Sequence, residues 1–351
     1  MYTHSPRTIV GTVRILIAPD KFKGSLTAAE VAAAVARGIG DRAVVTVLPL
    51  ADGGDGSVEA AASAGFDRHG TIAFDGHTAI VEVANTCGIA LLDELDPLGA
   101  STFALGEAIL SALALNPQRI VIALGGSAST DGGAGMLAAL GARFFGAQGE
   151  FVPTGGTLSD IDRVDLTGLV ALPELVCATD VSNPLTGPLG AAAVFGPQKG
   201  ATPPHVSLLD AGLAHLATIM RADDAASTPG AGAAGGTGFA AITLGASIVS
   251  GADFFLDLLG FDRHLEDSDL VVTGEGQLDE QTAAGKLVAV VARRAAPVPV
   301  VAVVGRSLLS GKEARAIGLS RVYALSDLAD TSGDPALTAR LLEDFGRNLA
   351  R

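Results

Sequence analysis

The sequence has little of what disulfide-stabilised, zinc-binding or secreted proteins need. Its two cysteines, Cys87 and Cys177, lie far apart in apolar surroundings, so neither a disulfide framework nor a zinc site is expected. The segment Met1–Val13 has no apolar signal-peptide core, and the most apolar helical stretch, Ala240–Phe261, is interrupted by acidic residues. These absences predict a cytoplasmic protein without a membrane span.

Aromatic side chains and positive charge are also scarce. Without tryptophan and with only two tyrosines, the chain offers no residue to propose as a stacking partner for a nucleotide base. The net charge of −15 disfavours nucleic acids and anionic membranes as partners. An anionic ligand would therefore need local donors such as backbone N–H groups, lysines and a divalent cation. The sequence indicates no oligomeric state.

Several catalytic motifs are missing as well. The chain has no GxxxxGK[ST] phosphate loop, no GxSxG nucleophile elbow and no complete GxGxxG dinucleotide fingerprint, which sets aside a nicotinamide dehydrogenase. Its six histidines are scattered outside the glycine-rich loops and lack zinc spacing. Chemistry based on histidine is therefore disfavoured.

What the chain does contain is typical of a large α/β protein. Of its 351 residues, 48% are hydrophobic and 17% are charged, so it can bury a sizeable core in about two domains. Short β-branched runs that end in glycine- or aspartate-rich turns, followed by alanine-rich stretches, are typical of parallel βα units. The predicted strands are Arg14–Ala18, Val44–Leu48, Arg119–Leu124, Leu175–Ala178, Leu270–Thr273, Val300–Val304 and Arg321–Leu325.

The first helix is the best specified element. Residues Thr27 to Glu30 form a capping box, with Leu26 and Val31 placed for a hydrophobic staple across it. Gly38 and Gly40 are the expected stop signals at its C-terminal end.

The order of the elements predicts a doubly wound, Rossmann-like parallel-sheet domain that is interrupted by a second α/β domain. Short alternating segments at Thr71–Phe74 and Ala79–Val83 indicate antiparallel strands, and βαβ units resume near Phe261. We therefore assign residues 1–65 and 261–351 to the discontinuous domain and residues 66–260 to the inserted one.

Polar, glycine-dense segments follow most of the predicted strands. Ligands of parallel sheets bind beyond the carboxyl ends of the strands, where free N–H groups and helix N-termini meet. The aspartates, lysines, hydroxyl groups and glycine loops found there are those that phosphoryl transfer requires, so we expect a phosphate-handling enzyme. The segments are Asp20–Ser25, Ala51–Ser57, Gly125–Gly133, Thr179–Asn183 and Gly274–Asp279.

These segments also resemble those of the two-domain bacterial glycerate kinases. Seven stretches match in family order: APDKFKGSLTAAEV, ADGGDGS, GGSASTDGGAGM, TDVSNPLTGPLGAA, FGPQKGA, PGAGAAGGTG and TGEGQLDEQTAAGK. The resemblance implies transfer of the ATP γ-phosphoryl group, with Mg²⁺, to a hydroxyl of D-glycerate, and favours 2-phosphoglycerate as product. It also implies an active site in the cleft between two domains.

The sequence departs from the family pattern at a few positions. Gln277 stands where an arginine commonly follows GEG, and a glutamine cannot neutralise phosphate or carboxylate charge. Further departures occur at Ala104, Thr130, Thr179 and Val288. Two alternatives therefore stay open: a kinase of another small hydroxy acid, and a binding relative that has lost catalysis.

Site residues follow from the matched motifs. Asp180 and Lys23 are the expected catalytic residues, with Asp180 as general base or Mg²⁺ ligand. Those expected to bind the substrate are Asp20, Ser25, Asp52, Asp55, Ser127, Asp131 and Asn183. Those expected to bind the nucleotide are Gly235, Gly236, Gly274, Glu275, Gly276, Asp279, Lys286 and Lys199.

Several of these residues also have a purely structural interpretation. Asp55, Asp131 and Asp279 each precede a predicted helix and would serve as caps. Asp20 and Asp180 would stabilise turns, and Lys23 and Lys199 would be ordinary surface lysines.

Overall fold

The computed structural model describes residues 12–283, 285–330 and 334–349. The chain divides into two compact units, one made of residues 1–50 and 260–351 and the other of residues 51–259. We call them unit 1 and unit 2. The first division lies at Leu50–Ala51 rather than at residue 65, because α2 (Ser57–Ser63) packs against β4 and β5 of unit 2. The structure is α/β, as predicted.

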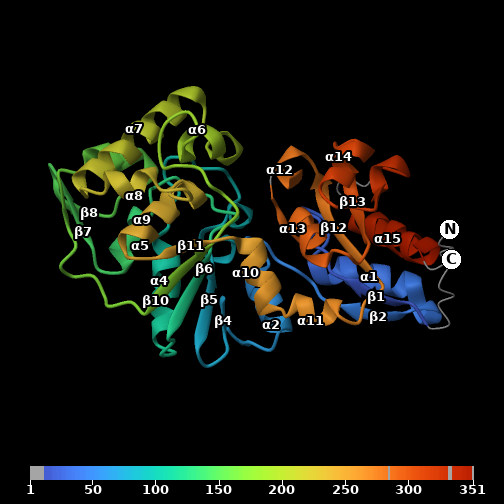
Figure 1. Ribbon diagram of the computed structural model, residues 1–351. Coiled ribbons are helices and arrows are strands. Elements are labelled where there is room, and N and C mark those ends of the chain that lie inside the picture. Colours follow the sequence, from blue (N-terminus) through green and yellow to red (C-terminus); the bar gives the residue numbers. More distant parts are fainter. Residues whose placement is uncertain (1–11, 284, 331–333, 350–351) are drawn as a thin grey trace, which may run out of the picture. The chain divides into compact units, whose positions relative to one another are not determined.

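Unit 1 is a doubly wound parallel sheet (Figure 1). Its strands lie in the order β14-β13-β12-β1-β2, and all their pairings are parallel. The strands are β1 (Arg14–Ile17), β2 (Val44–Val47), β12 (Leu270–Leu278), β13 (Val300–Ser307) and β14 (Arg321–Ala324). The helices are α1 (Ala28–Ile39), α11 (Phe261–Leu265), α12 (Glu280–Ala283), α13 (Leu287–Ala295), α14 (Gly311–Ala316) and α15 (Pro335–Leu349), with 3₁₀ turns at Gly40–Arg42 and Leu325–Asp327.

Helix α1 begins and ends for local reasons. Thr27 and Glu30 form the predicted capping box, and Gly40 follows the last turn with a φ of 56°. Gly38 is not a stop signal, however. It lies inside the helix, where a Cβ atom would stand 2.1 Å from the backbone oxygen of Glu343 in α15. Gly38 therefore allows α1 and α15 to pack closely on one face of the sheet.

Unit 2 has a mixed sheet in the order β11-β10-β6-β5-β4-β3. β4 is antiparallel to β3 and β5, as the alternating segments predicted, and the remaining pairings are parallel. A small antiparallel sheet, β8-β7-β9, is separate. The strands are β3 (Asp67–His69), β4 (Ile72–Phe74), β5 (Thr78–Glu82), β6 (Arg119–Ala123), β7 (Arg143–Gly146), β8 (Gly149–Phe151), β9 (Arg163–Asp165), β10 (Glu174–Ala178) and β11 (Ser247–Val249).

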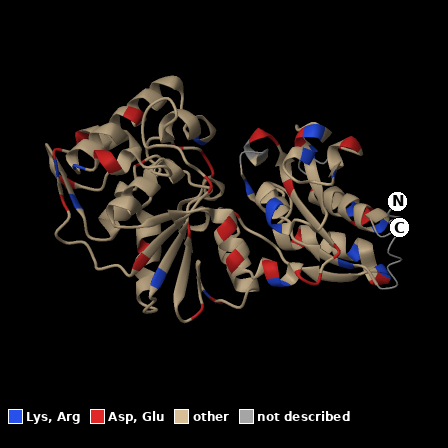
Figure 2. Ribbon diagram, viewed as in Figure 1, with Lys and Arg blue, Asp and Glu red and all other residues tan. Residues whose placement is uncertain are grey.

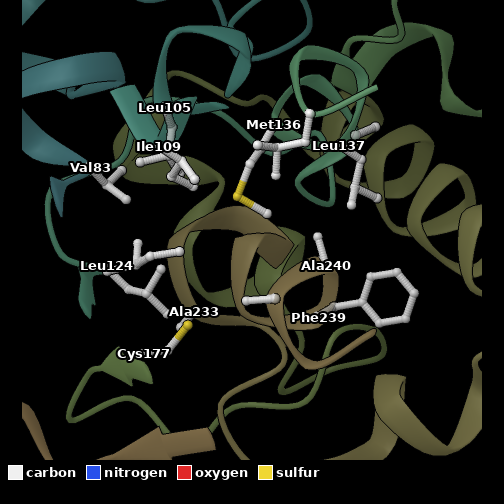
Figure 3. Close-up of a cluster of buried hydrophobic side chains, with 14 of the residues drawn as sticks. Val83, Leu105, Ile109, Leu124, Met136, Leu137, Cys177, Ala233, Phe239 and Ala240 are labelled. Carbon is white, nitrogen blue, oxygen red and sulfur yellow. The ribbon is translucent and has the colours of Figure 1, made fainter. Parts of the chain in front are cut away.

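Helices cover both faces of this sheet. On one face α4 contacts β5, α9 contacts β10 and β11, and α5 contacts both α4 and α9. α2 contacts β4 and β5, and α10 contacts β10 and α2. The helices are α3 (Ala84–Cys87), α4 (Phe103–Leu113), α5 (Ala134–Ala139), α6 (Ala191–Phe195), α7 (Pro203–Ile219), α8 (Asp223–Ser227), α9 (Thr237–Thr243) and α10 (Gly251–Leu258), with 3₁₀ turns at Ile89–Leu91, Gly155–Asp160, Pro197–Lys199 and Ala233–Gly236. Figure 3 shows the core where Leu124, Met136, Cys177 and Phe239 meet. Cys87 and Cys177 are both free thiols.

The apolar stretch Ala240–Phe261 is not one helix. It contains the end of α9, then β11, then α10, whose acidic residues Asp253 and Asp257 colour this helix red in Figure 2. Gly245 has a φ of 87°, which ends α9 and lets the chain turn into β11. Within the described residues, no helix is both long and apolar enough to cross a membrane.

Candidate active site

The sheet of unit 1 has a topological switch between β1 and β12. β1 leads through α1 to β2 on one side, and β12 leads through α13 to β13 on the other. Right-handed crossovers in opposite directions place the two helices on opposite faces, so the loops after β1 and β12 diverge. This is the position where open parallel sheets bind ligands.

The loop after β1 is tied to β12 by its backbone. The Asp20 N–H donates to the Gly274 carbonyl oxygen at 2.8 Å. The Asp20 carboxylate accepts a hydrogen bond of 2.7 Å from the Lys21 N–H, so it does stabilise a turn. Lys23 is exposed, and its backbone passes so close to Gly276 that a Cβ atom there would stand 3.2 Å from the Lys23 nitrogen. The switch thus brings Asp20 and Lys23 beside Gly274 and Gly276.

Ser25 has a structural partner. Its hydroxyl donates to the Thr338 Oγ1 of α15 at 3.2 Å, and Thr338 is itself bonded to the Asp334 carbonyl oxygen. Ser25 therefore helps fasten the loop that precedes α1 to α15.

The segment Gly274–Asp279 was predicted as a turn, and this is wrong for most of its length. β12 continues to Leu278, because residues 274 to 278 pair in parallel with β13. Gly274 is required by this packing, since a Cβ atom would stand 2.1 Å from the Val303 carbonyl oxygen. Only Asp279 lies beyond the strand. It accepts a hydrogen bond of 3.3 Å from the Thr282 N–H and so caps α12 as expected.

Glu275, near the end of β12, has a perturbed carboxylate. Burial raises the pKa of Glu275 to about 7, and Asp20 and Asp279 add to the rise. The Thr282 hydroxyl, which donates to Glu275 Oε1 at 2.6 Å, and the charge of Lys286 oppose it. Lys286 stands at the N-cap of α13. Glu275 thus lies close to Asp279 and Lys286, which were also predicted to bind the nucleotide, and to Asp20, which was predicted to bind the substrate.

The raised pKa of Glu275 makes a prediction about stability. The pKa of Glu275 is higher in the folded state than the value of about 4.3 in the unfolded chain. Its contribution to the free energy of unfolding is therefore present at low pH and is lost as pH rises through 7. Glu275→Gln keeps an acceptor for Thr282 but does not titrate. Relative to the parent, we expect this variant to gain about 1–2 kcal/mol of unfolding free energy between pH 5 and pH 8. Urea unfolding at both pH values measures it, with the exposed Glu266→Gln as control. If the difference in unfolding free energy between variant and parent were the same at pH 5 and pH 8, the pKa of Glu275 would lie in its ordinary range.

A pocket opens beside the edge strand β14. It has a volume of about 470 Å³ and is lined by the end of β13, by α14 and by β14 along its length, from Leu319 to Ala324. Ser307 pairs with Leu278 of β12. Unit 1 therefore has room for a small organic group one strand away from the switch.

In unit 2, the structure brings two carboxylates together at the strand ends. Asp180 follows β10 and accepts hydrogen bonds from the Ser250 hydroxyl at 3.0 Å and from the Ala252 N–H at 3.3 Å. Its partner is thus the N-terminus of α10 rather than a local turn. Asp52 accepts from the Gly54 N–H at 3.0 Å. Although Asp180 is partly exposed, loss of hydration and the nearby negative charge of Asp52 raise its pKa to about 6.

Asp55 lies on the same loop as Asp52 but does not cap α2. The N-cap position is Gly56, and the N–H groups of Gly56 and Val58 donate to the carboxylate of Glu82 at 3.1 and 2.9 Å. Glu82 is 2% exposed at the end of β5. It anchors the Asp52–Asp55 loop, and its role was missed because it lies in an apolar strand far along the chain. The signal that could have identified Glu82 is its position as an acidic residue at the end of an otherwise apolar strand.

Asn183 and Asp131 have their side chains engaged within unit 2. The Asn183 amide donates to the Leu189 carbonyl oxygen at 2.8 Å. Asp131 is fully buried, and its carboxylate accepts from the Thr102 N–H and hydroxyl and from the Gly133 and Gly135 N–H groups at 2.8 to 3.3 Å. The capping interpretation of Asp131 is therefore supported. Thr102, which sequence reasoning did not identify, is its main partner.

The glycine loop 125–133 rests on the segment 233–236. Ser127 is 6% exposed, and its hydroxyl lies 3.3 Å from the Ser129 carbonyl oxygen and 3.4 Å from that of Ala234. Gly235 and Gly236 have positive φ, and a Cβ atom on Gly235 would stand 2.0 Å from the Ser129 oxygen. Gly235 and Gly236 therefore lie in unit 2 with Ser127, whereas the other predicted nucleotide-binding glycines lie in unit 1.

Lys199 is not a surface lysine. Its side chain is buried at 3% exposure, and its ammonium donates to the Ser129 carbonyl oxygen. Burial lowers its pKa to about 8, against the opposing effect of Asp131. Lys199 therefore supports the glycine loop from inside unit 2.

Comparison with known proteins links this arrangement to a family. A model of the glycerate kinase family matches residues 15–351. The chain is 41% identical to a glycerate kinase of Bacillus subtilis strain 168, over 84% of this chain and 85% of that protein. It is 40% identical to a glycerate 2-kinase of Escherichia coli K12, over 78% and 80%. A crystal structure from Salmonella typhimurium LT2 that carries the provisional name glycerate kinase 2 superposes with a TM-score of 0.78, at 36% identity over 97% and 98% of the two chains.

Proposed function

The chain belongs to the glycerate kinase family, and from this premise we propose that it transfers the γ-phosphoryl group of ATP to a hydroxyl of D-glycerate, giving ADP and phosphoglycerate. The observation that carries the proposal is the family match over almost the whole chain. 2-Phosphoglycerate is the favoured product, because one of the similar curated proteins is named glycerate 2-kinase.

We assign the acceptor to the strand ends of unit 2. Their loops come into close contact: a Cβ atom on Gly125 would stand 2.4 Å from the Gly54 Cα, and one on Gly53 would stand 2.7 Å from the Ala178 oxygen. Backbone N–H groups of such loops suit the glycerate carboxylate. Asp52, Asp55 and Ser127 are the proposed contacts, while Asn183 and Asp131 shape the loops that carry them.

Asp180 is the proposed general base. The acceptor oxygen forms a bond to the γ-phosphorus, the bond from that phosphorus to the ADP oxygen breaks, and the hydroxyl proton passes to the Asp180 carboxylate. A base works best with a pKa near the operating pH, and the pKa of Asp180 is raised to about 6. The hydrogen bonds from Ser250 and Ala252 hold the carboxylate in a fixed orientation.

We assign the nucleotide to the switch of unit 1. Lys286, at the N-cap of α13, and the exposed Lys23 are the proposed phosphate ligands, and Gly274 and Gly276 let the backbone of β12 approach its neighbours closely. Lys23 would stabilise the charge that develops on the transferred group. The loops around the proposed nucleotide site are held in shape by Asp20, Ser25, Glu275 and Asp279.

The carboxylates of unit 2 also fit a magnesium ion. Mg²⁺ prefers oxygen ligands and is usually held by one or two carboxylates, completed by water and phosphate oxygens. Among the residues described, no group of three or more His, Cys, Asp or Glu side chains could hold a metal. The repulsion between Asp52 and Asp180 nevertheless leaves negative charge that a divalent cation would neutralise. As the alternative to a role as general base, Asp180, with Asp52, is therefore the proposed ligand. When bound, Mg²⁺ would offset the charge of the phosphates.

A coupled assay of ADP release tests the function. We expect turnover with D-glycerate that depends on ATP and Mg²⁺ and exceeds turnover with other three- and four-carbon hydroxy acids. NMR of the product identifies the phosphorylated carbon. Turnover only with another hydroxy acid would keep the kinase class and reject the substrate.

The catalytically impaired relative is the second candidate, and Gln277 favours it. The Gln277 amide donates to Asp279 at 2.8 Å, so this position carries no positive charge. Binding of ATP or glycerate by calorimetry without turnover, together with activity restored by Gln277→Arg, would support this candidate over the active kinase.

A further inference from the structure

The environment of Lys199 is unusual for a lysine. It ends the 3₁₀ turn Pro197–Lys199 and is 3% exposed, so its ammonium group cannot reach a ligand in solvent. That group donates to the carbonyl oxygen of Ser129. The charged or titratable groups that act on it are Asp131, which is fully buried, and Cys87, whose own pKa is raised to about 12 by burial. Cys87 is thus neutral at physiological pH, and Asp131 is the compensating charge.

Ser129 links Lys199 to the proposed acceptor site. On one side its carbonyl oxygen accepts from Lys199, and on the other its N–H donates to the Ser127 Oγ at 3.2 Å. The Ser127 and Ser129 hydroxyl oxygens are also 3.2 Å apart. The backbone conformation of Ser129, which joins these two peptide groups, therefore couples Lys199 to the position of the Ser127 hydroxyl. Gly235 also holds the glycine loop 125–133 in place, because its carbonyl oxygen accepts a hydrogen bond from the Gly132 N–H at 3.0 Å.

We propose that Lys199 is a positioning residue of the kinase: its buried ammonium group, bonded to the Ser129 carbonyl, fixes the Ser127–Ser129 segment in the conformation that binds the acceptor carboxylate. The proposal rests on the function proposed above. It assigns Lys199 to the acceptor half of the reaction rather than to the nucleotide, which the sequence alone had suggested.

The surroundings of Lys199 also determine how its substitution affects stability. The pKa of Lys199 falls from about 10.4 in the unfolded chain to about 8 in the folded one. A lowered pKa means that its contribution to stability is present above pH 10.4 and is lost as pH falls through 8. At pH 7 the desolvated ammonium therefore costs the fold stability, and an apolar side chain of similar length would remove this cost. The same change would leave the buried Asp131 carboxylate without its compensating charge.

The test compares Lys199→Met with Lys312→Met, which removes an exposed lysine from α14. For Lys199→Met we expect kcat/KM for glycerate to fall by about ten- to hundredfold, the usual effect of a misplaced contact, with KM for ATP within about twofold. Its Tm should fall, because the buried Asp131 carboxylate loses its compensating charge, so the kinetics are measured well below the Tm of each protein. Lys312→Met should match the parent in all three. An unchanged kcat/KM for glycerate, or equal effects on glycerate and on ATP, would overturn the proposal.

The pH dependence of the parent gives a test that needs no variant. In the parent, kcat/KM for glycerate should fall as pH rises through about 8, because a neutral amine makes a weaker hydrogen bond than an ammonium. This alkaline decrease should be absent from Lys199→Met, and a flat parent profile to pH 9.5 would reject the role.

Hydrogen exchange separates the proposal from the function on which it rests. The amides of Ser129 and Gly132 should exchange faster in Lys199→Met while core amides do not. Faster exchange without any glycerate turnover by the parent would reject the proposed function but keep the positioning of the loop. Unchanged exchange in an active parent would reject the positioning.

Discussion

Asp180→Asn is expected to lower kcat by at least about a hundredfold, the scale at which a general base or a charge-stabilising group contributes. Asparagine keeps an oxygen that can accept from the Ser250 hydroxyl and the Ala252 N–H, so the end of β10 should stay attached to α10. What is lost is the negative charge and the basicity. The repulsion from Asp52 also disappears, so the variant should be at least as stable as the parent.

The measurement is kcat at saturating ATP and glycerate, with Tm recorded alongside. Asp224→Asn, which removes an exposed carboxylate of α8 in the same unit, is the matched control and should retain parental values. The Mg²⁺ dependence distinguishes the two proposed roles of Asp180: a metal ligand would raise the Mg²⁺ concentration needed for half-maximal rate, and a pure base would not. Near-normal turnover would leave Asp180 as a cap of α10.

Gly235→Ala is expected to have the second large effect. A Cβ atom at this position would stand 2.0 Å from the Ser129 carbonyl oxygen and 2.8 Å from the Thr130 Cα, and the φ of 67° is unfavourable for alanine. Because the neighbouring atoms are backbone, the glycine loop must move. We expect a loss of about 3 kcal/mol or more of unfolding free energy and a fall in kcat/KM for glycerate of about a hundredfold.

Gly245→Ala separates the clash from the backbone strain. Gly245 also lies in unit 2 and has a φ of 87°, but a Cβ atom there would have no neighbour within 4 Å. Its substitution should cost only about 1–2 kcal/mol and leave kcat/KM unchanged. Urea unfolding and the ADP-release assay measure both variants. Equal losses in the two would mean that the loop accommodates the methyl group.

The sequence predicted best what local chemistry determines. The start of α1 is set by Thr27 and Glu30, which are three residues apart, and the structure confirms this capping box. Asp279 caps α12 for the same kind of reason. Strand positions were also close, since β-branched runs bounded by glycine-rich turns carry their own signal. The α/β class and the family follow from patterns of this type.

What sequence reasoning missed depends on contacts between distant residues. Gly38 looked like a stop signal, but the neighbour that requires it is Glu343 of α15. Residues 274 to 278 have the composition of a turn, yet pairing with β13 makes them a strand. Lys199 looked like a phosphate ligand or a surface lysine, because only the fold places Ser129 next to it. The missed residues Glu82 and Thr102 hold loops that come from other parts of the chain.

The discontinuity of unit 1 bears on the order in which the protein is assembled during synthesis. The interior strand β1 pairs with β2, which is synthesised before unit 2, and with β12, which begins at Leu270 and is synthesised after it. Unit 2, in contrast, is continuous from Ala51 to Leu259 and contains its own core. Domains generally fold as they leave the ribosome, so unit 2 is able to fold before unit 1. At that stage β1 can pair with β2 but not yet with β12. Until β12 has been synthesised, one edge of β1 has no strand to pair with. That exposed edge can pair with other chains, so the β1–β2 segment is prone to aggregation during synthesis.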